Sequence, residues 1–109
     1  MWKNKRHEFD DYAKRWNDKQ RYILYGAGNL GREFFDKFSD KINIIGFCDS
    51  DKTKIGETFC GKAVNSLENF EDCKIIVTSR YYAEIKEMLL LKGLEEDVDF
   101  TYEQQFEAV

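Results

Sequence analysis

The chain has 109 residues and a formal net charge of -4, with 42% hydrophobic and 35% charged side chains. This composition is too apolar for a disordered chain, and the negative charge gives no long-range attraction to nucleic acid or to an anionic membrane. No apolar run approaches the roughly 20 residues of a membrane-spanning helix, and the N-terminus lacks the apolar core of a signal peptide, so we expect a soluble, cytoplasmic protein.

The chain contains no proline, repeat or low-complexity linker, so we expect one domain, with an added N-terminal helix in residues 1–20 and the main unit in residues 21–109. Cys48, Cys60 and Cys73 are spaced like neither a metal site nor a redox motif. The only histidine, His7, has no partner at ligand spacing. No metal site is predicted.

The first predicted element is an amphipathic helix over residues 4–19. Phe9, Tyr12 and Trp16 recur at helical spacing among charged residues. We expect this aromatic face to pack on the rest of the domain or on a second copy of the chain, so a homodimer through this helix is one expectation.

Strands and helices then alternate. The apolar run at residues 22–25 predicts a buried first strand, and the four-residue spacing of Leu30, Phe34 and Phe38 predicts a helix. Residues 42–48 read as a second strand that ends at a polar turn over residues 49–52.

The second half of the chain repeats this pattern. Residues 55–66 predict an irregular excursion and a small third strand near residues 62–65. The β-branched run at 75–78 predicts a fourth strand, residues 83–92 a helix that stops at Gly93, and residues 98–102 a fifth strand. Alternating strands and helices favour a parallel sheet with right-handed crossovers.

The most informative segment is the glycine loop at residues 25–32, Tyr-Gly-Ala-Gly-Asn-Leu-Gly-Arg, between the first strand and the first helix. Gly26 permits a tight turn, Gly28 lets a phosphate approach the backbone, and Gly31 lets helix and strand pack closely. Backbone amides at the helix start, including those of Asn29 and Leu30, then suit a phosphate or pyrophosphate. The alternative is that the glycines serve only turns and packing.

An acid follows at the expected distance. Asp49 ends the second strand 18 residues after Gly31, close to the offset of about 20 residues at which an acid accepts ribose hydroxyls. A carboxylate there also repels a 2'-phosphate, which favours NAD over NADP. Asp51 is a substitute for this role.

Three further side chains are candidates. Arg32 lies in the first helical turn, where we expect it to make either a phosphate contact or a surface ion pair. Ser79 and Tyr81 follow the fourth strand, where open α/β sheets bind ligands. The alternatives for this pair are helix capping by Ser79 and packing by Tyr81.

Tyr82 and Lys86 have the tyrosine-x-x-x-lysine spacing of short-chain dehydrogenases, in which lysine lowers the tyrosine pKa. In that family the pair lies on a later helix, with a serine upstream. We therefore assign no catalytic residue.

Residues 21–106 resemble the small Rossmann domains found beside glycosyltransferases, acyltransferases and epimerase-like dehydratases in bacterial polysaccharide biosynthesis. The resemblance is carried by the glycine loop, by Ile-Gly-Phe-Cys-Asp-Ser-Asp-Lys at 45–52, by Gly56 with Gly-Lys-Ala-Val at 61–64, and by Ile-Ile-Val-Thr-Ser-Arg-Tyr-Tyr at 75–82. It implies a ligand such as NAD, a UDP-sugar or another nucleoside diphosphate sugar, or coenzyme A.

We therefore expect a three-layer Rossmann-like α/β sandwich with the parallel sheet order 3-2-1-4-5. The expected function is a nucleotide-binding module, linked to polysaccharide biosynthesis and not catalytic alone. Two alternatives stay open at this point. One is an NAD-dependent epimerase or dehydratase acting on sugar nucleotides, and the other is a ligand-free interaction module.

Overall fold

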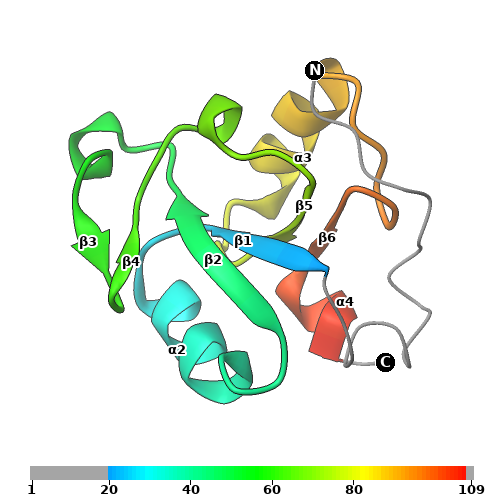
Figure 1. Cartoon of the computed structure of the whole chain (residues 1–109). Helices are drawn as coiled ribbons and strands as arrows, with labels where there is room; N and C mark the ends of the chain where they lie inside the picture. Colours follow the sequence, from blue (N-terminus) through cyan, green and yellow to red (C-terminus); the bar gives the residue numbers. More distant parts are fainter. Residues whose placement is uncertain (1–19, 108–109) are drawn as a thin grey trace.

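Four strands form one parallel sheet in the order β2-β1-β5-β6 in the computed structural model, which describes residues 20–107 (Figure 1). They are β1 (Arg21–Tyr25), β2 (Asn43–Cys48), β5 (Cys73–Val77) and β6 (Phe100–Tyr102). All five residues of β5 and the last four of β1 are buried. β1 contains the run that was predicted as a strand buried on both faces, and β5 contains the β-branched run that predicted the fourth strand.

Helices cover both faces of this sheet, as Figure 1 shows. Along β1, Tyr22 and Leu24 pack with side chains of α2 (Asn29–Phe38) and α4 (Glu103–Glu107). The alternate residues of β1 pack with α3 (Tyr82–Leu91) on the opposite face. This alternation follows from the two-residue period of a strand. The described residues therefore form a small α/β unit with a four-stranded parallel sheet and three helices.

The predicted strand order 3-2-1-4-5 is wrong at its first position. The small strand expected near residues 62–65 forms a separate antiparallel hairpin, in which β3 (Thr58–Phe59) pairs with β4 (Lys62–Ala63). Gly61 at the turn has a φ of +77°, which favours glycine and reverses the chain before a longer strand can form. A single parallel bridge, between Phe47 and Val64, joins this region to β2.

The other predicted elements agree within a few residues. The helix predicted from the spacing of Leu30, Phe34 and Phe38 is α2, the helix predicted at residues 83–92 is α3, and the final predicted strand is the shorter β6. Helix α4 and two short 3-10 helices, η1 (Lys52–Lys54) and η2 (Leu67–Asn69), were not predicted. The amphipathic helix that was predicted for residues 4–19, with the dimer role expected of it, falls outside the described residues.

No helix within residues 20–107 combines the length and the apolar character that crossing a membrane requires.

Candidate functional site

An open cavity of about 880 Å³ lies where β1, β2 and β5 end. Its wall combines the glycine loop, the segment after β2, η2 and the start of α3. Among the lining residues are Gly26, Gly28, Asn29, Leu30, Asp49, Asp51, Lys54, Glu68, Ser79, Arg80 and Tyr81. The structure therefore brings most of the predicted site residues to one cavity, at the carboxyl edge of the parallel sheet.

Gly26 makes the turn out of β1 in a space that no side chain could share. Its φ is +136°, and a Cβ atom at this position would collide with the backbone carbonyl of Thr78. The Thr78 hydroxyl donates a 3.0 Å hydrogen bond to the Gly26 carbonyl oxygen, and the Gly26 amide donates to the Cys48 carbonyl at 2.8 Å. The loop is thus held by the ends of both strands that flank β1.

Gly31 and Gly28 have different surroundings. A Cβ atom at Gly31 would collide with the Gly26 carbonyl oxygen, so this glycine permits the close approach of α2 to the loop. At Gly28 a Cβ atom would meet nothing within 4 Å among the described residues, and the backbone is extended. The backbone at Gly28 is therefore open toward the cavity, as the phosphate-approach role requires.

The start of α2 offers backbone donors. The first turn of any α-helix leaves N–H groups without partners inside the helix, and these carry the positive end of the helix dipole. Gly28 is the N-cap residue of α2, and in the described part of the chain no side chain caps this end. Because Gly28, Asn29 and Leu30 line the cavity, this end of the helix borders it.

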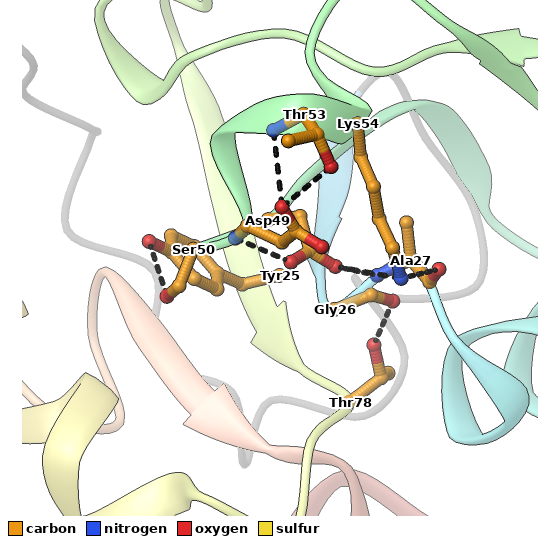
Figure 2. Close-up of polar contacts among 9 residues, drawn as sticks. Tyr25, Gly26, Ala27, Asp49, Ser50, Thr53, Lys54 and Thr78 are labelled. Carbon is orange, nitrogen blue, oxygen red and sulfur yellow. Dashed lines mark hydrogen bonds and ion pairs between the residues drawn. The ribbon is translucent and has the colours of Figure 1, made fainter.

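Asp49 points at the glycine loop (Figure 2). Its Oδ2 accepts a 2.8 Å hydrogen bond from the Ala27 amide, and its Oδ1 accepts one of 2.8 Å from the Asp51 amide. Each carboxylate oxygen can accept more than one hydrogen bond, so both keep capacity for a ligand hydroxyl. The predicted pairing of loop and acid is therefore present as a direct contact.

Lys54 is a site residue that sequence reasoning missed. Its Nζ donates a 2.9 Å hydrogen bond to the Ala27 carbonyl oxygen and lies 3.8 Å from Asp49 Oδ2 (Figure 2). Nothing in the sequence marks this lysine, because its approach to the loop depends on the fold of η1.

Asp51 has a local role. Its Oδ1 accepts hydrogen bonds from the Thr53 amide at 3.0 Å and the Thr53 hydroxyl at 2.7 Å, which caps η1. These hydrogen bonds hold the pKa of the Asp51 carboxyl below its ordinary value. Asp51 borders the cavity, but Asp49 is the acid that contacts the loop.

Ser79 and Tyr81 form a turn at the entrance to α3. Ser79 Oγ accepts a 3.1 Å hydrogen bond from the Tyr81 amide. Tyr81 is itself the N-cap residue and has no side-chain capping bond, so the expected capping by Ser79 is replaced by this turn. Tyr81 is 63% exposed, so it borders the cavity without the packing role that was its alternative.

Arg32 is directed toward the β3–β4 hairpin. Its guanidinium lies over the Phe59 ring, 4.7 Å from the centroid, and Nη1 lies 4.0 Å from Cys60 Sγ. The cavity lining does not include Arg32.

Tyr82 and Lys86 both contact the carboxylate of Glu96. Tyr82 donates a 2.6 Å hydrogen bond to one Glu96 carboxylate oxygen, and Lys86 Nζ lies 3.0 Å from the other. Burial, followed by this hydrogen bond, raises the pKa of the Tyr82 phenol well above its ordinary value. A general base of the dehydrogenase type needs the opposite shift.

The chain is similar to a known family of protein domains. No curated protein matches the chain. Residues 18–98, which include the glycine loop, Asp49 and Ser79, match the model of a family described as C2185-like, N-terminal. Because the match covers most of the sequence, the chain belongs to the C2185-like N-terminal domain family.

Proposed function

We propose that this chain binds a nucleotide with a diphosphate, either NAD or a nucleoside diphosphate sugar, in the cavity at the glycine loop. The observation that carries the proposal is the open backbone at Gly28, at the uncapped start of α2 and on the cavity wall. Backbone N–H groups and the helix dipole favour a phosphate at such a position. The sheet with helices on both faces supports the Rossmann-like assignment.

Asp49 supports the nucleotide part of the proposal. Its carboxylate borders the same cavity, and each oxygen keeps acceptor capacity after the two backbone hydrogen bonds. A ribose hydroxyl next to the diphosphate would donate to this carboxylate. A 2'-phosphate there would bring like charges together, so we propose a preference for NAD over NADP.

The charges of the cavity wall are mixed. Acids and bases both line it, with Lys52, Lys54, Arg80 and Lys92 as the basic side chains. Of these, Lys54 contacts the glycine loop, so the wall offers a cation to a diphosphate there as well as acceptors to sugar and ribose hydroxyls. It therefore suits a ligand that carries both kinds of group.

We further propose that the chain binds its nucleotide without transforming it. The one candidate catalytic pair, Tyr82 and Lys86, is tied to Glu96, and neither residue lines the cavity. The link to polysaccharide biosynthesis stays a prediction from the resemblance.

Titration calorimetry tests the proposal with NAD, NADP, UDP-glucose and coenzyme A as separate ligands. We expect heat and a raised unfolding temperature with NAD or UDP-glucose, and weaker binding of NADP than of NAD. Absence of heat and of a thermal shift with all four ligands at millimolar concentration would contradict the proposal.

A further inference from the structure

Asp49 creates an electrostatic conflict at the glycine loop. Its carboxylate accepts a hydrogen bond from the Ala27 amide, so a negative charge lies beside the backbone that would receive a phosphate. The Asp49 side chain is only 15% exposed, so water screens this charge less than it would screen a charge on the open surface. The Ala27 carbonyl oxygen adds a second partial negative charge to the loop.

Lys54 is placed to offset both charges. Its ammonium group hydrogen-bonds the Ala27 carbonyl at 2.9 Å and lies 3.8 Å from Asp49 Oδ2, on the wall of the same cavity. The ammonium has three donors, and the hydrogen bond to Ala27 uses one of them. Figure 2 shows the Lys54 side chain extending from η1 to the glycine loop. Lys54 therefore connects two of the segments that form the cavity wall.

We infer that Lys54 is the ligand-binding residue that makes the glycine loop competent to hold a diphosphate. It neutralises Asp49 and directs a charged donor toward the bound phosphate. This inference rests on the proposed function and adds a specific cation to it.

Lys52 provides a matched comparison. It belongs to the same 3-10 helix, lines the same cavity and carries the same charge. Within residues 20–107 its side chain makes no hydrogen bond or ion pair, whereas Lys54 contacts the loop directly. A general effect of positive charge on anion binding would involve both lysines, and the inferred role involves Lys54 alone.

The test is calorimetric titration of inorganic pyrophosphate into the wild-type chain and three variants: Lys54→Met, Lys52→Met, and Lys54→Met combined with Asp49→Asn. We expect Lys54→Met to weaken binding roughly tenfold or more, the size of a lost hydrogen bond to a charged group. We expect Lys52→Met to weaken it by less than about twofold, as for a screened surface charge. The double variant should recover much of the affinity, because it removes the charge that Lys54 offsets.

Two further readouts separate binding from structure. The unfolding temperature of each variant shows whether the fold is kept, and the salt dependence of pyrophosphate affinity should be shallower for Lys54→Met than for Lys52→Met. Equal losses for the two single variants, or no recovery in the double variant, would overturn the inference. Wild-type chain that binds NAD or UDP-glucose but no pyrophosphate would overturn it and leave the proposed function standing. Failure to bind pyrophosphate and both nucleotides would overturn the proposed function as well.

Discussion

Gly28 and Gly31 lie on the same turn of chain but face different surroundings. We expect Gly28→Val to weaken nucleotide binding roughly tenfold or more while leaving the unfolding temperature almost unchanged, because its side chain would extend from open, extended backbone that borders the cavity. Calorimetry with NAD or UDP-glucose and thermal unfolding measure the two effects.

Gly31→Ala is the contrasting variant. Its Cβ atom would collide with the Gly26 carbonyl, so we expect a loss of about 1–3 kcal/mol in the free energy of unfolding. If Gly28→Val bound nucleotide as well as the wild-type chain, the open backbone would not be the ligand-binding surface.

The place of the glycines in a loop between a strand and a helix could be predicted from the sequence. The approach of Lys54 to that loop could not. Gly26 and Gly31 each have a conformational or steric requirement that a local pattern between a strand and a helix conveys, whereas Gly28 lies on open backbone at the cavity wall. Lys54 reaches Ala27 only because η1 folds over the loop, and no spacing within the sequence encodes that contact. For Arg32 the local pattern was misleading. Its place in the first helical turn suggested a phosphate contact, but its guanidinium lies over the ring of Phe59, in a hairpin that is far away in the sequence.

At the scale of elements, a buried hydroxyl at the end of β5 contacts the glycine loop. Thr78 is 2% exposed, and its hydroxyl donates to the Gly26 carbonyl. We expect Thr78→Val, which keeps the shape and removes the donor, to lower the free energy of unfolding by about 1–3 kcal/mol. Urea unfolding measures this change.

Thr78→Ser is the control, because it retains the hydroxyl. It should lose less stability than Thr78→Val and keep nucleotide binding. Equal stability of the valine variant and the wild-type chain would show that this hydrogen bond does not hold the loop.

The central strands could be predicted because their signal is local. β1 contains the apolar run at residues 22–25 and β5 contains the apolar run at residues 75–77, so a short stretch of sequence marks each strand. The β3–β4 hairpin could not be predicted, since two-residue strands carry no period and the turn depends on the positive φ of Gly61. Helix α4 is similarly short, and its Phe106 is buried against Phe34 of α2, a contact between opposite ends of the described chain.

At the scale of the whole molecule, two buried thiols link stability to pH. Burial raises the pKa of the Cys73 thiol to about 11 and raises that of Cys48 further, from an ordinary value of 9.0. The unfolded chain therefore releases these protons at a lower pH than the folded chain. Stability is fully present below about pH 9 and falls as the pH rises toward 11, by up to about 1.4 kcal/mol per pH unit for each thiol.

Urea unfolding of the wild-type chain and Cys73→Ala at pH 8, 9 and 10 measures this effect, under reducing conditions. Other groups also titrate in this range, so the informative quantity is the difference between the two slopes. We expect the wild-type chain to lose stability more steeply than the variant. Identical slopes would mean that the Cys73 thiol ionises equally easily in the folded and unfolded chains.

The proposed function depends on the backbone amides of residues 28–30 receiving a diphosphate. Amide chemical shifts, recorded by nuclear magnetic resonance during a titration with NAD and with UDP-glucose, report on these groups directly. We expect the largest and earliest changes at Gly28, Asn29 and Leu30, with smaller changes near Asp49. Saturating ligand that shifts other amides and leaves those three unchanged would contradict the account.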